Sequence, residues 1–191
     1  MAALVSACGD VEYGAAVAAI ISDRPDAAGL AFAAEAGIPT AIVAPSDFPD
    51  RPTWDAAVAR TAAAFEPDLI VCAGFMRLLG APVLEAFPGR IVNAHPALLP
   101  AFPGAKAVRD AIAAGVKVTG CTVMLVDEGV DTGPILAQRA VDVHADDTED
   151  TLHERIKAVE RELVIATIGT MVQSGWTIDG RTTRMKTRRR D

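Results

Sequence analysis

A cluster of prolines constrains the middle of this chain more strongly than any other feature. Pro96, Pro100 and Pro103 follow an apolar run that ends at Val92, and Gly104 comes next. Proline lacks a backbone N–H and fixes φ, so this segment can be neither a helix nor a central strand. The run before it, residues 90–92, is predicted to be a buried strand. We therefore expect a strand that leads directly into a rigid loop.

Two polar side chains mark the end of this strand. Asn93 and His95 are two residues apart, so the alternation of an extended chain points them in the same direction. Polar groups at the carboxyl end of a strand are where open α/β sheets bind ligands. Taken alone, the pair would more often be a loop-capping Asn and a hydrogen-bonded His. A second polar segment, residues 127–135 with Asp131 near its centre, favours a site, although Asp131 by itself would be an ordinary turn residue.

Predicted strands and helices alternate along the chain, which indicates an α/β fold. The sequence has no internal repeat and no low-complexity linker, so we expect a single domain over residues 1–191. Its core would be a mostly parallel, Rossmann-like sheet with helices on both faces. The predicted strands are residues 14–21, 40–44, 69–73, 90–92, 116–126 and 135–143, and the predicted helices are residues 27–36, 50–65, 81–87, 105–114 and 147–174, with a helix permitted over 1–10.

The composition excludes several classes of protein. The 191 residues are 51% hydrophobic but only 5% aromatic, which suits one core built from Ala, Val, Ile and Leu. No apolar run reaches the ~20 residues that cross a bilayer, and the amino terminus lacks a signal pattern. We therefore expect a cytoplasmic protein with no membrane partner. The net charge of −7 argues against a nucleic-acid partner. Cys8, Cys72 and Cys121 are widely spaced, so we expect buried thiols and no metal.

Basic residues crowd the C-terminal end of the chain. We expect residues 181–191 to form a solvated, disordered tail, and the alternative is an arm that binds RNA. The basic residues concerned are Arg181, Arg184, Lys186, Arg188, Arg189 and Arg190.

Several ordered motifs resemble the signature of the folate-dependent formyltransferases. Residues 95–100 read His-Pro-Ala-Leu-Leu-Pro, where the family has Ser in place of Ala97, and residues 131–134 supply the family's Asp-x-Gly-Pro. Residues 73–79 and the segments 22–25 and 37–40 also match. Within the family the resemblance is strongest to the phosphoribosylglycinamide formyltransferases, and it extends from about Ala15 into the last helix. It implies the formyltransferase fold.

The resemblance also implies an activity. These enzymes transfer a formyl group from 10-formyltetrahydrofolate, a co-substrate, to the amine of phosphoribosylglycinamide in purine synthesis. The partners would then be small molecules, with no nucleic acid, and the chain would be a monomer or a homodimer. Attack on the formyl carbon creates an oxyanion, and each well-placed hydrogen-bond donor is worth ~3–4 kcal/mol there. Asn93 and His95 would be the donors, and the anionic Asp131 would favour protonated His95 and accept the amine's proton through water.

Further residues carry over to the two substrates. Arg51 and the segment Met76, Arg77, Leu78 and Leu79 fall where the family binds folate, together with Asn93. Exposed main chain beside apolar side chains suits a flat pteridine ring. Without the resemblance, Arg51 would be a solvated helix-start residue and the segment would be core. Glu160 matches a glutamate that contacts the glycinamide substrate, although an exposed helical Glu often has no such role.

The chain departs from the family at its start and at Met124. The family opens with a strand and a Gly/Ser-rich loop that holds the substrate phosphate at a helix start. Here Met1 falls near the end of that helix, so we expect an incomplete N-terminus, no site for the ribose phosphate and a slot in the sheet between residues 15–21 and 69–73. The alternative makes residues 2–7 the first strand. Met124 stands where relatives commonly carry His.

Other functions remain open at this stage. The chain could be a folate-binding remnant without catalysis, or another formyltransferase or hydrolase that uses 10-formyltetrahydrofolate. Retention of Asn93, His95 and Asp131 favours catalysis.

Overall fold

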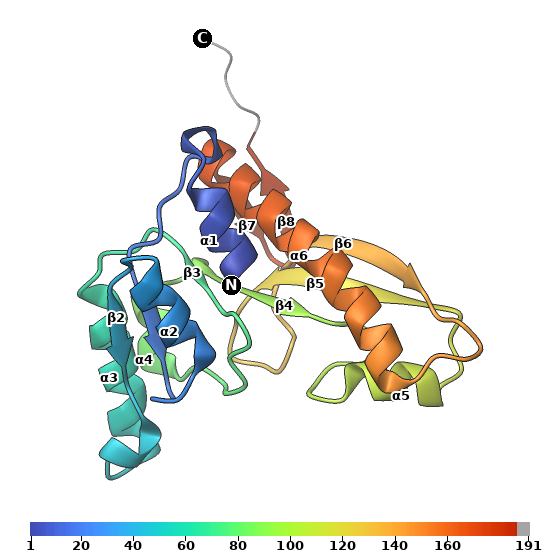
Figure 1. Cartoon of the computed structure of the whole chain (residues 1–191), viewed down its shortest axis with the longest axis horizontal. Coiled ribbons are helices and arrows are strands. Elements are labelled where there is room, and N and C mark those ends of the chain that lie inside the picture. The colour runs from blue at the N-terminus through green and yellow to red at the C-terminus, as the bar shows by residue number, and fades with distance from the viewer. Residues whose placement is uncertain (187–191) are drawn as a thin grey trace.

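The computed structural model describes residues 1–186 and contains two sheets surrounded by helices (Figure 1). The predicted α/β fold is confirmed. The helices are α1 (Ala2–Cys8), α2 (Ala28–Glu35), α3 (Arg51–Ala63), α4 (Ala81–Ala86), α5 (Ala107–Ala113) and α6 (Glu149–Ser174), with short 3₁₀ turns at Val11–Tyr13 and Pro45–Asp47. The strands are β1 (Ile20–Ser22), β2 (Thr40–Ile42), β3 (Ile70–Val71), β4 (Ile91–His95), β5 (Val118–Leu125), β6 (Ile135–Asp142), β7 (Trp176–Asp179) and β8 (Thr182–Met185).

The larger sheet is mixed, so the prediction of a mostly parallel sheet is wrong for this part of the fold. Its order is β3-β4-β5-β6-β8-β7. The β3–β4 and β6–β8 pairs are parallel, whereas β4–β5, β5–β6 and β7–β8 are antiparallel. The connection from β5 to β6 is too short for the crossover of a dozen or more residues that parallel neighbours need. A hairpin is therefore the only arrangement open to these two long strands.

The smaller sheet pairs β1 with β2 in parallel and is separate from the larger one. Within residues 1–186, β1 pairs only with β2, and β3 only with β4, so β1 and β3 form no hydrogen-bonded ladder with each other, as the predicted slot requires. Ile21 and Ile70 nevertheless pack against the same apolar cluster. Asp23, just after β1, accepts a hydrogen bond at 2.7 Å from Arg77, which lies beyond β3. The carboxyl ends of these two strands therefore lie close together.

Helix α6 crosses the larger sheet and completes its core (Figure 1). Leu152 and Ile156 of this helix are fully buried in one cluster with Val123 and Leu125 of β5. Helix α1 packs against α6 through the partly buried Leu4. A smaller cluster joins α3 and α4 to the start of β4. Strand β4 is therefore packed on both sides, which makes its carboxyl end a rigid support for side chains.

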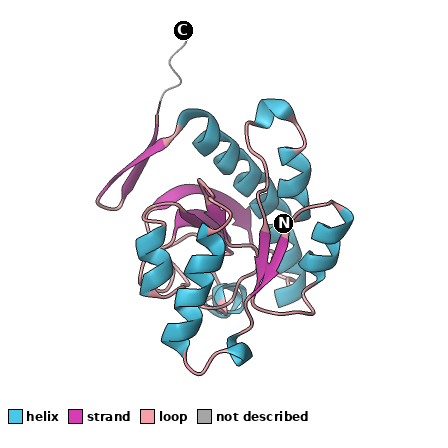
Figure 2. Cartoon of the chain, turned by 90° about the vertical axis from the view of Figure 1, so that its left-hand side faces the viewer, coloured by secondary structure: helices cyan, strands magenta, loops and turns pink. Residues whose placement is uncertain are grey.

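The C-terminal end is more ordered than the sequence predicted. Residues 181–191 were expected to be a disordered tail, but residues 182–185 form β8, which pairs with β7 and β6. The hairpin projects from the end of α6 at the upper left of Figure 2 and is attached by the Trp176 indole, which donates to the carbonyl of Gly89 at 3.1 Å. Residues 187–191 lie outside the described part. Strand β1 is also shorter than predicted, because its ladder with β2 starts at Ile20.

No helix in the described residues is both long and apolar enough to cross a membrane.

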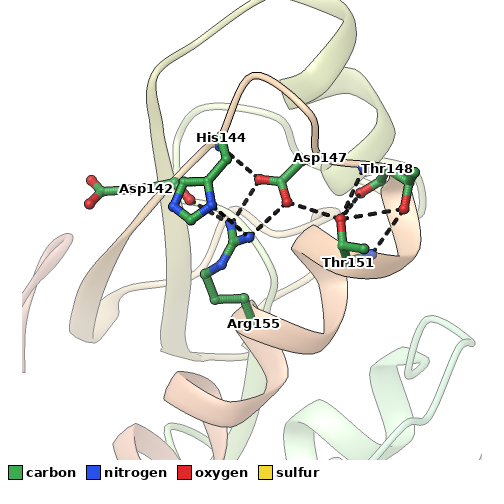
Figure 3. A network of polar contacts seen from close by, with 6 residues as sticks. All are labelled: Asp142, His144, Asp147, Thr148, Thr151 and Arg155. Atoms are coloured by element: carbon green, nitrogen blue, oxygen red, sulfur yellow. Dashed lines mark hydrogen bonds and ion pairs between the residues drawn. The ribbon is translucent and has the colours of Figure 1, made fainter.

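A partly buried ion pair secures the start of α6 (Figure 3). The Arg155 guanidinium donates to both carboxylate oxygens of Asp147, at 2.7 and 2.8 Å, and to the carbonyl of Asp142 at 2.9 Å. Thr148 caps the helix, and Thr151 returns a bond to complete a capping box. The hydrogen bond from Arg155 holds the pKa of the Asp147 carboxyl well below its usual range. The network therefore anchors α6 to the end of β6.

We expect this ion pair to make stability depend on pH in the acid range. A lowered folded-state pKa means that the contribution is complete above the ordinary Asp pKa of ~3.9 and is lost as the pH falls from there. Asp147→Asn should lower the melting temperature at pH 7 by ~5 °C, and the difference from the parent should shrink by pH 3. Thermal unfolding followed by circular dichroism checks this. A difference between the two proteins that stays constant with pH would contradict it.

Candidate functional site

His95, at the end of β4, is buried between two hydrogen-bond acceptors. Its Nδ1 lies 3.2 Å from Oδ2 of Asp131, and its Nε2 lies 2.8 Å from the carbonyl oxygen of Phe102. A carbonyl only accepts, so Nε2 carries a hydrogen. A neutral ring with its hydrogen on Nε2 has none on Nδ1, so two acceptors, Nδ1 and the Asp131 carboxylate, would face each other without a hydrogen bond. The imidazolium, with N–H groups on both nitrogens, satisfies both partners.

Asp131 reaches His95 from the loop between β5 and β6. Its backbone adopts a left-handed conformation with φ of 54°, which is uncommon for any residue but glycine and is tolerated best by Asp and Asn. The N–H of Gly104 donates to the same Oδ2 at 2.7 Å. The carboxylate thus joins two loops. The resemblance implied that Asp131 would favour protonated His95, and the 3.2 Å contact is close enough for that effect.

The Asp131 loop is fixed by its own contacts. One carboxylate oxygen of Asp127 accepts from the Gly129 N–H at 3.0 Å and from the Thr132 hydroxyl at 2.6 Å. Gly133 lies so close to the Leu125 carbonyl that a Cβ atom would collide with it. These contacts fix the conformation of the loop between β5 and β6. They therefore hold Asp131 in its strained backbone geometry.

We expect Gly133→Ala to destabilise the protein by ~2–3 kcal/mol, since the added Cβ must displace backbone atoms. It should also lower catalytic turnover by moving Asp131. Gly37→Ala is the matched control, because Gly37 has φ of 67° but open space around its Cβ position. That change should cost only the left-handed strain, ~1 kcal/mol. Urea unfolding measures both, and equal losses would contradict the packing argument.

A cleft of about 60 Å³ opens beside this pair, lined by Asn93 and Asp131. Asn93 lies opposite Met124 in the β4–β5 ladder. Met124 is buried and forms an apolar wall of the cleft, so it supplies no polar group there. Cys72 lines the cleft too, and burial raises the pKa of its thiol to about 11. Met124 and Cys72 thus contribute uncharged walls to a cleft that Arg77 and Asp131 also line.

The residues predicted for folate divide between this cleft and its surroundings. Arg77, Leu78 and Leu79 line the cleft together with Phe75. The side chain of Met76 does not line it and is 79% exposed. Leu78 is also more than half exposed, so apolar surface is open to solvent at the cleft rim.

Arg51 lies in a second cleft of about 240 Å³, which shares Arg77 with the first. Its guanidinium forms a 2.8 Å bond with the buried carboxylate of Asp55, donates to the carbonyl of Leu78 and lies 4.8 Å above the Trp54 ring. Arg51 therefore also fastens the rim segment that contains Leu78.

Glu160 lies on α6, outside both clefts. Burial raises the pKa of its carboxyl, while the nearby charges of His153 and His95 oppose that rise. The structure thus brings Glu160 into the electrostatic surroundings of His95.

Sequence reasoning missed the backbone groups of the site. The carbonyl of Phe102 and the N–H of Gly104 contact His95 and Asp131, yet neither depends on a particular side chain. Gly104 has φ of 89°, and a glycine directly after Pro103 was the available signal. The ion pair of Arg51 with Asp55, spaced i and i+4 on a predicted helix, could also have been expected.

Comparison with known proteins identifies relatives of this chain. The family described as "Formyl transferase" matches residues 1–168. The phosphoribosylglycinamide formyltransferase of Mycobacterium tuberculosis is 53% identical over 182 residues, which is 95% of this chain and 83% of that protein. The protein of the same name from Bacillus subtilis is 40% identical over 160 residues, 84% of this chain and 82% of the relative. The crystal structure of glycinamide ribonucleotide transformylase 1 from Symbiobacterium toebii superposes with a TM-score of 0.93 at 44% identity, covering 97% of this chain and 87% of that one.

Proposed function

The chain belongs to the formyl transferase family, and on that premise we propose that Asn93, His95 and Asp131 carry out its chemistry. The reaction is transfer of a formyl group from 10-formyltetrahydrofolate to the amine of phosphoribosylglycinamide, a step of purine synthesis. The observation that carries the proposal is the His95 ring, held between two acceptors beside the cleft that Asn93 lines.

The first step forms the new C–N bond. The substrate amine attacks the formyl carbon, and the electron pair of the carbonyl moves onto oxygen. In our proposal the Asn93 amide donates to that oxygen, which gains negative charge in the transition state. Imidazolium His95 is the second donor, and its Nδ1–H is shared between this oxygen and the Asp131 carboxylate. The Phe102 carbonyl keeps the other ring N–H occupied, so the ring is oriented before substrate binds.

The second step removes a proton and the leaving group. The attacking nitrogen becomes positively charged and must lose a proton, which Asp131 accepts through a water molecule. The oxyanion then collapses, the bond to the folate nitrogen breaks, and that nitrogen takes up a proton to give tetrahydrofolate. Asp131 is suited to both roles because its carboxylate stabilises the imidazolium and lies at the cleft.

The surrounding residues would bind the two substrates. We propose that Phe75, Arg77, Leu78, Leu79 and Asn93 form the folate slot, with Arg51 and Met76 at its outer rim. Glu160 would hold the glycinamide amine. The substrates are small molecules, so a cytoplasmic monomer or homodimer is proposed, with no nucleic-acid or membrane partner.

Formation of tetrahydrofolate in the presence and absence of phosphoribosylglycinamide tests this proposal. We expect formation that requires the amine substrate and yields formylated product in equal amount. Release of free formate without the amine would instead favour a hydrolase, and folate binding without turnover would favour a non-catalytic remnant.

A further inference from the structure

Gln138 fastens the proline loop that follows His95. This residue lies on β6, and its side-chain NH2 group donates to the Leu99 carbonyl and to the Thr122 hydroxyl, both at 2.9 Å. An amide nitrogen has two donors, so both are used. The residue thus connects a strand of the sheet to the loop without contacting the reacting groups.

Thr122 relays this contact from inside the fold. Its side chain is fully buried on β5, and its hydroxyl donates to the Ala97 carbonyl at 2.7 Å while accepting from the Leu99 N–H at 3.0 Å. With the bond from Gln138, the hydroxyl makes the one donor and two acceptor contacts that it can make. Leu98, between these two loop residues, lies directly over Gly120, where a Cβ atom would collide with it. The first turn of the loop is therefore fixed to β5 and β6.

The far end of the same loop carries the contacts of the candidate site. The Phe102 carbonyl accepts from His95, and the Gly104 N–H donates to Asp131. Phe102 itself is held in a left-handed conformation with φ of 54°. Such a conformation persists where surrounding contacts over-determine it. The loop therefore spans from the Gln138 attachment to the His95–Asp131 pair.

We propose that Gln138 is a positioning residue of the formyl-transfer site, acting through Thr122 and Leu99. The inference rests on the proposed function. By fixing residues 97–99, Gln138 sets where the Phe102 carbonyl meets Nε2 of His95 and where Gly104 meets Asp131. The ring is then held with Nδ1 towards Asp131, which lines the cleft. A shift of ~1 Å in a catalytic group lowers rates by up to ~10²-fold.

Gln138→Glu is the sharpest test, because the carboxylate has nearly the same shape but has no N–H to donate. We expect kcat to fall ~10- to 100-fold while KM for both substrates changes less than ~3-fold. The chain has three histidines, so ¹⁵N-labelled histidine gives an assignable spectrum of the ring nitrogens. The parent should show N–H signals from both His95 nitrogens, and the variant should lose or shift the Nε2–H signal.

Three further variants keep the result interpretable. Thr122→Ser retains the hydroxyl and should behave like the parent, whereas Thr122→Val should reproduce the Gln138→Glu effects even if the latter folds poorly. Arg139→Gln, which removes a neighbouring β6 contact to Glu162 at 3.1 Å, should leave kcat and the His95 spectrum unchanged.

Two outcomes would overturn the proposal: a parent-like kcat in Gln138→Glu and Thr122→Val, or a lowered kcat with a parent-like His95 spectrum. The spectrum requires no turnover. If the parent protein does not transfer formyl groups, the proposed function is wrong. The effect of Gln138 on the His95 ring is still tested by the spectrum.

Discussion

Asp131→Asn is expected to lower the kcat of formyl transfer by ~10³–10⁴-fold. The amide keeps the shape of the carboxylate, and an amide oxygen at the Oδ2 position can still accept from Gly104 and face Nδ1 of His95. The amide carries no negative charge, however, so it no longer stabilises the imidazolium against the neutral ring. The variant therefore favours the neutral ring, whose single N–H is needed by the amide oxygen or by the Phe102 carbonyl, which leaves none for the substrate oxygen. The water that deprotonates the amine also loses its acceptor.

Steady-state kinetics with both substrates measures this effect. KM should change little, since the lost interactions strengthen only in the transition state. Asp110→Asn is the control, because Asp110 is an exposed carboxylate on α5 that pairs with its neighbour Arg109. A kcat within tenfold of the parent in Asp131→Asn would mean that Asp131 is only a turn residue.

Asn93→Ala is expected to lower kcat by ~10²–10³-fold, because it removes one of two proposed donors to the oxyanion. His95 and Asp131 keep their contact in this variant, so a residual rate should remain. Asn93→Asp should be slower still, since it places a negative charge next to the oxygen that gains charge. A rise in folate KM with unchanged kcat would show that Asn93 binds the ground state only.

The sequence was informative where chemistry depends on side chains in a local pattern. Asn93 and His95 form the end of a strand that leads into prolines, and that pattern predicted both the strand end and the cleft. The long last helix was predictable from Thr148 at its start and Gly175 at its end. Asp131 could be paired with His95 only through the family motifs, because nothing local distinguishes it from a turn residue.

Other features depend on contacts between distant parts of the chain. The β7–β8 hairpin follows from pairing with β6 and from Trp176 on Gly89, neither of which a charged terminal sequence reveals. Phe102 and Gly104 contact the site through a backbone carbonyl and a backbone N–H, so their side chains do not reveal these contacts. Met76 was expected in the folate slot because its segment falls where the family binds folate, but its side chain is exposed and does not line the cleft.

The central claim is that His95 and Asp131 act as one unit in formyl transfer. The most direct test is the single-turnover rate of the parent, His95→Ala, Asp131→Asn and the double variant. Residues that act together are strongly non-additive, so the double variant should be slower than the slower single variant by less than ~3-fold. If the losses of the two single variants multiply in the double variant, the two residues act independently and the proposed mechanism is wrong.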